Sequence, residues 1–191
     1  TFSLNQHVGQ RTREKGYVPA PAIIGGALEC CDHPANIGGG TSQWTTTLYN
    51  ATFFAGLEDV FHQPHSEVIS RYPEGREATL GWPAPDLVFR NNTGHAIVIR
   101  ATYTDTSVTA KIYGDNGGLV VEAGLGGRYN YTAMITRHEQ NDELACGTEQ
   151  VKSEGTGGWS VDYFRYITYP DGHQTTEKWT WHYTGLYKII E

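Results

Sequence analysis

Residues 38–57 read GGGTSQWTTTLYNATFFAGL, and this stretch decides the fold that we expect of the chain. Its nonpolar residues recur at spacings of three and four, the period of a helix with one buried face: Trp44, Leu48, Ala51 and Ala55. We predict a helix at about residues 42–57, capped by the hydroxyl of Thr41 or Ser42 and stopped by Gly56. No other segment of the sequence has a convincing helical period, so this is the main helix.

The composition outside this helix favours β structure. The 191 residues include 12 Tyr, 5 Trp and 23 Gly, a usage that suits short strands joined by tight turns. Alternating runs at residues 159–169 and 174–187 meet at the turn Pro170-Asp171-Gly172 and indicate a hairpin. We therefore expect an α+β fold, predominantly antiparallel β, with the helix packed on the sheet and a C-terminal β-hairpin module.

Size, charge and hydropathy limit the organisation and the partners of the chain. We expect a first domain at residues 1–123 and a small β appendage at residues 124–191. The net charge of -7 argues against duplex nucleic acid as a partner, because such a partner demands a basic face. No stretch has the apolar length of a membrane span. The sequence begins with Thr1 rather than Met, so we expect a mature or excised piece whose targeting segment is missing.

The three cysteines are Cys30, Cys31 and Cys146, and their spacing does not match a zinc site. We predict one long-range disulfide from Cys30 or Cys31 to Cys146, with one thiol left over. Three free thiols are the alternative, and an oxidising location would favour the bridge. We predict neither a metal nor a cofactor.

A series of motifs runs in order through the first part of the chain. These are Phe2-Ser3-Leu4-Asn5, Val8 to Thr12, Glu14 to Tyr17, Gly38 to Gln43, Thr46 to Ala51, His65-Ser66, Tyr72 to Thr79 and Asp86 to Asn91. Together they resemble the VanW family over roughly residues 1–113, and the rest is similar to the small β appendage that often follows this domain. The resemblance implies an exported or envelope-associated protein. One family member lies in vancomycin-resistance gene clusters, but membership supplies no reaction.

The reading that we favour is a binding site without bond cleavage. Helix-start amides and a glutamine side chain would hold a carboxylate or a sugar hydroxyl, arginines would pair with carboxylates, and aromatic rings would stack on sugars. The residues proposed for these roles are Gly39, Gly40, Ser42, Gln43, Arg11, Arg71, Arg76, Trp44, Tyr72 and Trp82. Peptidoglycan carries both sugars and peptide carboxylates, so we expect cell-wall glycan or peptide as the partner and an extracellular or envelope location.

Two alternatives remain open. In the first, the glycine-loop residue is a nucleophile, as the resemblance to papain-like and NlpC-type hydrolases implies; Ser42 would attack, His65 would be the base, and Asp86 or Glu77 would orient the imidazole. Many family members carry Cys at the position of Ser42, and a site tuned for a thiolate does not transfer simply to serine. In the second, the chain is a structural spacer or part of a surface assembly. The oligomeric state is open.

Overall fold

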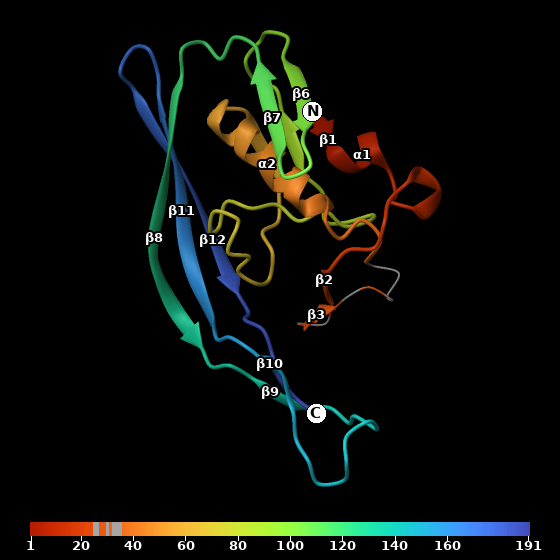
Figure 1. Cartoon of the computed structure of the whole chain (residues 1–191). Coiled ribbons are helices and arrows are strands. Elements are labelled where there is room, and N and C mark those ends of the chain that lie inside the picture. Colours follow the sequence, from red (N-terminus) through yellow and green to blue (C-terminus); the bar gives the residue numbers. More distant parts are fainter. Residues whose placement is uncertain (25–26, 30, 32–35) are drawn as a thin grey trace.

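The computed structural model describes residues 1–24, 27–29, 31 and 36–191, and it has the predicted α+β fold. Figure 1 shows the main helix α2 (Thr41–Phe54) between a long, curved three-stranded sheet and a β-hairpin, with the N-terminal elements on the far side of the helix. The long sheet has the order β12-β11-β8, from β8 (Val120–Thr132), β11 (Gly158–Thr168) and β12 (Gln174–Tyr183). The hairpin against α2 is formed by β6 (Val98–Tyr103) and β7 (Val108–Tyr113).

Three smaller sheets complete the described part of the chain. One has the order β1-β5-β4, from β1 (Phe2–Ser3), β5 (Val88–Arg90) and β4 (Glu58–Phe61). A second has the order β10-β13-β9, from β10 (Val151–Glu154), β13 (Lys188–Ile190) and β9 (Thr136–His138). The third pairs β2 (Ala22–Ile24) with β3 (Ala27–Glu29). Two short helices, α1 (Leu4–Val8) and the 3₁₀ helix η1 (Arg13–Lys15), lie near the N-terminus. Of the strand pairs described, only β13 with β9 is parallel.

The strands β11 and β12 pair in one continuous antiparallel register. It runs from Trp159 opposite Tyr183 to Thr168 opposite Gln174, around the turn expected at residues 170–172. The other edge of β11 pairs with β8, which crosses the position between residues 123 and 124 without a break. The division of the chain at that position stays a prediction.

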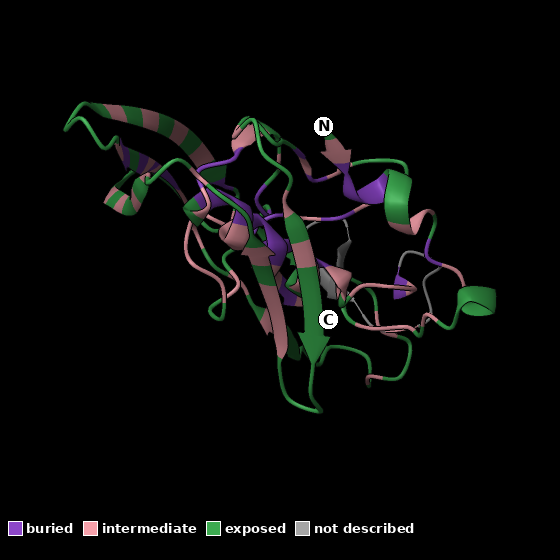
Figure 2. Cartoon of the chain, turned by 90° about the horizontal axis from the view of Figure 1, so that it is seen from above, coloured by how far each residue is buried: buried purple, intermediate pink, exposed green. Residues whose placement is uncertain are grey.

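The core forms where α2 meets the smaller strands. It contains Leu4, Leu48, Tyr49, Phe53, Leu57, Ala78, Leu80, Leu87 and Phe89. Figure 2 shows the buried residues gathered in the middle of the molecule, while positions along β12 alternate between intermediate and exposed, as one-sided packing of a sheet requires. The apolar stripe expected on the helix is only partly right. Leu48 is buried, but Trp44 and Ala55 are partly buried at the margin of the core.

The buried face of α2 is unusual because much of it is polar. Three of its side chains, which we call the polar row, lie four residues apart and bind the backbone of residues 76–80, the docked segment. Ser42 Oγ accepts from the Leu80 amide at 3.2 Å, Thr46 Oγ1 accepts from the Ala78 amide at 3.1 Å and donates to its carbonyl at 3.3 Å, and Asn50 Nδ2 donates to the Arg76 carbonyl at 3.0 Å. Four helical residues rise about 6 Å and two extended residues span about 6.6 Å, so the two backbones keep step.

The predicted N-terminal cap of the helix is wrong. The N-cap residue is Gly40, which makes no side-chain capping bond. Thr41 Oγ1 donates instead to the Gly38 carbonyl at 2.7 Å, and the Ser42 hydroxyl is taken up by the docked segment. The predicted stop is right in kind: α2 ends at Phe54, and Gly56 follows with a φ of 75° that favours glycine.

Arg165 on β11 fixes the long sheet to the C-terminal end of α2. Its side chain is 2% exposed, and Nη1 donates to the carbonyls of Leu57 at 2.9 Å and Phe53 at 3.4 Å. A cation is favourable at that end of a helix because the last carbonyls lack partners and carry the negative end of the dipole. Glu177 on β12 accepts from Arg165 Nε at 2.5 Å and balances the buried charge.

The predicted long-range disulfide is wrong. Cys146 is a free and exposed thiol, so it is not bridged to Cys30 or Cys31. Cys31 lies in a bend, and Cys30 falls outside the described residues. The loop with Cys146 lies instead beside the small sheet of β9, β10 and β13, where Asn141 Nδ2 donates to Glu191 at 2.9 Å.

Thr46→Val tests the polar row. The substitution removes the one hydroxyl that serves both the amide and the carbonyl of Ala78, a residue with 0% exposure. We expect the free energy of unfolding to fall by about 2 kcal/mol, because buried polar groups lose their partner. Urea denaturation measures this loss. Thr47→Val is the matched control, since Thr47 Oγ1 bonds only to the Gln43 carbonyl within the helix. Equal stability of the two variants would contradict the assignment.

Candidate functional site

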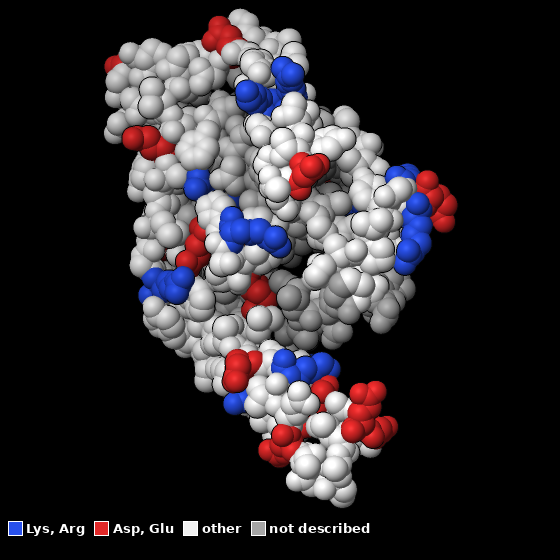
Figure 3. All heavy atoms as spheres, viewed as in Figure 1, with Lys and Arg blue, Asp and Glu red and all other residues white. Residues whose placement is uncertain are grey.

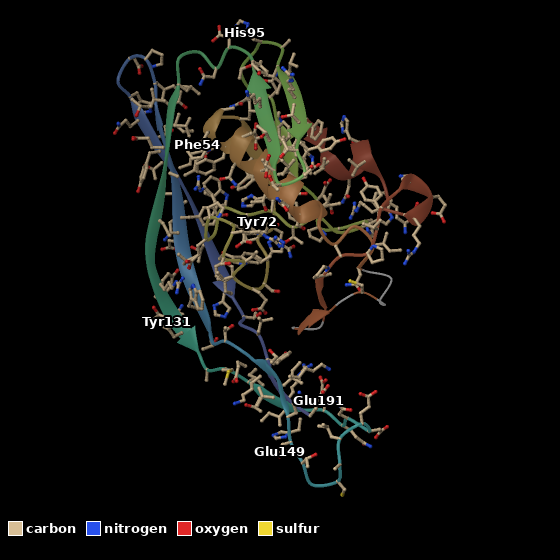
Figure 4. The ribbon with its side chains drawn as sticks, viewed as in Figure 1. Phe54, Tyr72, His95, Tyr131, Glu149 and Glu191 are labelled. Carbon is tan, nitrogen blue, oxygen red and sulfur yellow. The ribbon has the colours of Figure 1, made fainter. Side chains whose placement is uncertain are left out.

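A cleft of about 1060 Å³ opens beside the start of α2. Its walls are the glycine loop (Gly38, Gly39 and Gly40), the loop of residues 63–72, residues 79–85, and Trp181 at the end of the long sheet. Figure 4 labels Tyr72, whose loop lies between the long sheet and the N-terminal elements. The arrangement brings together segments that are far apart in the sequence.

Most of the predicted site residues line this cleft. They are Arg11, Gly39, Gly40, Ser42, Gln43, His65, Arg71, Tyr72 and Trp82. The remaining four, Trp44, Arg76, Glu77 and Asp86, do not line it. Trp44 packs against the hydrophobic core. Arg76 lies with its guanidinium 5.4 Å and 5.0 Å from the ring centres of Phe53 and Phe54 on α2.

Of the two carboxylates predicted to orient His65, the buried Glu77 contacts the imidazole and Asp86 does not. The imidazole Nδ1 lies 2.6 Å from Glu77 Oε2, and Glu77 is only 1% exposed. The other oxygen of Glu77 accepts from the Tyr183 hydroxyl at 2.6 Å, which itself accepts from the Gly75 amide at 2.7 Å. Burial raises the pKa of Tyr183, which keeps this hydroxyl a donor. A chain of hydrogen bonds from β12 therefore fixes the imidazole at the cleft wall.

Asp86 performs a different task at the N-terminus. Its carboxylate accepts from the Ser3 hydroxyl at 2.6 Å, the Asn5 amide at 2.9 Å and the Leu87 amide at 2.7 Å. These bonds anchor the start of α1 on the segment that leads into β5. The carboxylate is thus occupied by the first turn of a helix.

Ser42 is not arranged as an activated nucleophile. Its side chain is 8% exposed, and its oxygen accepts from the Leu80 amide. No hydrogen bond joins Ser42 to His65, both of which lie in the described part of the chain. An activated serine needs its base within hydrogen-bond reach. The residue therefore serves the fold at the cleft wall.

The glycine loop is shaped by close backbone approach. A Cβ at Gly39 would lie 2.5 Å from the Ala20 carbonyl oxygen, and Gly38 has a φ of 80° and sits on the side chain of Arg11. Arg11 is 9% exposed, and its Nη1 donates to Asn5 Oδ1 at 2.7 Å and to the Gly9 carbonyl at 3.3 Å. Desolvation lowers the pKa of Arg11. The aliphatic part of Arg11 thus packs against Gly38, while its guanidinium is bonded to Asn5 and Gly9.

Arg71 is the open positive charge of the cleft. It is exposed and makes no ion pair with any residue that the structure describes. Its guanidinium lies 5.5 Å from the ring centre of Tyr72, and that ring stacks on His65 with 5.4 Å between centres. A guanidinium held beside two stacked rings is well placed for a planar anion such as a carboxylate.

Two further cleft residues escaped the sequence-based site assignment. Trp181 on β12 donates from Nε1 to the His65 carbonyl at 2.8 Å, so the β11–β12 hairpin supplies part of the cleft wall. Glu67 is 3% exposed; one carboxylate oxygen lies 3.5 Å from the Thr184 hydroxyl, and the other has no hydrogen-bond partner in the part of the chain that the structure describes. Burial raises the pKa of Glu67 to about 7. The alternating aromatics of the hairpin are a signal for Trp181, whereas nothing in the pattern around Glu67 marks it as buried.

Charges elsewhere on the molecule do not extend this site. Acidic side chains gather at the lower tip in Figure 3, where Figure 4 labels Glu149 and Glu191. Neither of these residues lines the cleft. Across the described ranges, no group of three or more His, Cys, Asp and Glu side chains is placed to hold a metal ion. Nor is any described helix long and apolar enough to cross a membrane.

Glu67→Gln tests the burial of this carboxyl. A folded-state pKa of about 7 against an ordinary value of 4.5 means that the folded chain holds the proton more tightly. Stability should therefore fall as the pH rises from about 4.5 to 7, and the loss should be complete above the folded pKa. We expect Glu67→Gln to stabilise the chain at pH 8 by on the order of 2 kcal/mol, and by much less near pH 4.5.

Denaturant unfolding at the two pH values measures this difference. Glu122→Gln on β8 is the matched control, because Glu122 is exposed. A variant that stabilises the chain equally at both pH values would contradict the assigned burial.

Comparison with known proteins gives two findings. Residues 1–113 match the family model described as VanW like protein. Over 113 residues the chain is 42% identical to the protein named "Uncharacterized protein YoaR" of Bacillus subtilis (strain 168), a match that covers 59% of this chain and 36% of that relative. The matched segment is thus about a third of YoaR, whose name records no activity. No solved structure matches the chain.

Proposed function

We propose that this chain, which belongs to the VanW family, is a cell-envelope module that binds peptidoglycan through the cleft without cleaving it. The observation that carries the proposal is the exposed guanidinium of Arg71, which has no acidic partner among the described residues and lies beside the stacked rings of Tyr72 and His65. Peptidoglycan offers carboxylates to the guanidinium and sugar rings to the aromatic side chains.

The size and lining of the cleft support this class of ligand. A volume of about 1060 Å³ is at the upper end of the usual range for small-molecule sites and suits an extended fragment. The indole rings of Trp82 and Trp181 supply apolar surface, and the exposed side chain of Gln43 supplies a donor and an acceptor. Such a mixture is typical of sites that bind both a sugar ring and a peptide.

Binding is better supported than cleavage. Glu77 holds Nδ1 of His65 as the carboxylate of a catalytic triad would, but the Ser42 oxygen is engaged by the docked segment and makes no hydrogen bond to His65 among the described residues. A hydrolase of the papain-like type would need the hydroxyl and the imidazole in contact. A pure spacer, in turn, gives no reason for an open guanidinium and a buried carboxylate oxygen without a partner in one cleft.

The envelope location is part of the proposal. It rests on membership of the VanW family, which implies an exported or envelope-associated protein. One member of that family lies in vancomycin-resistance gene clusters.

Sedimentation with purified, insoluble peptidoglycan tests the proposal. We expect the wild-type chain to be retained in the pellet and Arg71→Ala to reduce the retained fraction at least about fivefold, because the carboxylate loses its partner. Arg100→Ala is the matched control, since Arg100 is exposed on β6 and does not line the cleft.

Mass spectrometry of the supernatant separates binding from cleavage. Wall fragments that the wild type releases and Ser42→Ala does not would replace the proposal by the hydrolase reading. Retention that is equal in Arg71→Ala and wild type would show that the cleft does not hold the wall, and absent retention would favour the spacer.

A further inference from the structure

Glu67 is the acidic counterpart of Arg71 in the same cleft. Of the described residues that line it, Glu67 is the one acidic side chain, and Arg11 and Arg71 are the basic ones. The Glu67 side chain is almost wholly buried, and its Oε2 atom finds no hydrogen-bond donor among the described residues. An unsatisfied buried carboxyl oxygen is costly and rare in folded proteins, so it needs a reason.

The surroundings of Glu67 show what is missing. Its other oxygen has one partner among the described residues, the Thr184 hydroxyl at 3.5 Å, which is a long and weak contact. Nearby charges do not neutralise it: His65 is paired with Glu77, and the exposed Arg71 makes no ion pair with Glu67. The described part of the chain therefore leaves an acceptor in the cleft wall and pairs no cation with it.

Glu67 and Arg71 lie within reach of one short ligand. They are four residues apart on one loop, so their Cα atoms are separated by at most about 14 Å. An extended peptide of two to four residues spans about 7–14 Å. A positive group and a negative group of one such peptide can therefore meet the two side chains together.

We infer that the ligand of the cleft is a peptide with a free carboxylate and a free primary amine, the carboxylate pairing with Arg71 and the ammonium group with Glu67. This inference rests on the proposed function and narrows it from wall material in general to the peptide part. A sugar hydroxyl would satisfy one oxygen of Glu67, but only a cation also compensates its charge. The indoles of Trp82 and Trp181 give the aliphatic stem of a lysine-type side chain an apolar path.

Calorimetric titration of the full chain at pH 8 tests the inference with three synthetic probes. The first is the tetrapeptide Ala-Gln-Lys-Ala with an acetylated N-terminus, so that the lysine carries its one amine. The second has that amine acetylated, and the third has a C-terminal amide in place of the carboxylate. We expect the first probe to bind at least about tenfold more tightly than either of the others, because each lacks one charge-assisted contact.

Variants assign each end of the probe. In Glu67→Gln we expect the first and second probes to bind within about twofold of each other, while the preference for a free carboxylate persists. In Arg71→Ala we expect the first and third probes to bind within about twofold of each other, while the preference for a free amine persists. Glu122→Gln and Arg100→Ala, both exposed and outside the cleft, should keep both preferences. The comparison of probes on the wild-type chain needs no variant, so it stands even if Glu67→Gln unfolds.

The outcomes separate this inference from the proposed function. Equal binding of the free and acetylated amines by the wild type would overturn the role of Glu67, while retention on peptidoglycan would leave wall binding intact. Retention on peptidoglycan with no binding of any probe would overturn the peptide assignment in favour of the glycan. If the wild-type chain neither binds a probe nor is retained on peptidoglycan, both proposals are overturned.

Discussion

The hydrogen bonds between the polar row of α2 and the docked segment are the constraint on which the site depends. Ser42, Thr46 and Asn50 hold an extended backbone against a helix, a task that is more often left to hydrophobic side chains. The docked segment contains Glu77, and Glu77 holds His65 at the cleft wall. The geometry of the cleft thus follows from the match between the rise of a helix and the rise of a strand.

Periodicity was sufficient to predict the main helix, the β-rich class and the residues around the C-terminal turn. It failed for the buried face of α2, because Ser, Thr and Asn in a helix are usually interpreted as caps or as exposed positions. Only the backbone of a segment more than twenty residues away explains why Thr46 and Asn50 are turned inward. For the same reason, the N-cap was wrongly predicted at Thr41 or Ser42, and the predicted apolar stripe of the helix was only partly right.

The residues of the candidate site could largely be predicted from the sequence, but the contacts between their side chains could not. The glycine loop, His65 and Arg71 stand in recognisable motifs, and they do line one cleft. The choice between Glu77 and Asp86 depended on folding contacts 12 and 83 residues apart in the sequence, which spacing rules do not supply. The matched family segment ends at residue 113, yet Trp181 on β12 completes the cleft wall. The cleft is therefore formed by the family segment together with the β11–β12 hairpin.

This shared construction has a kinetic consequence. The contacts of Ser42 with the docked segment close a loop of 38 residues, whereas the contact between Trp181 and His65 closes one of 116. Closing the longer loop costs more chain entropy before any contact rewards it, and folds rich in such distant pairings form slowly. The helix α2 and the docked segment can therefore assemble early. The cleft is completed only when the β11–β12 hairpin packs against the loop that contains His65.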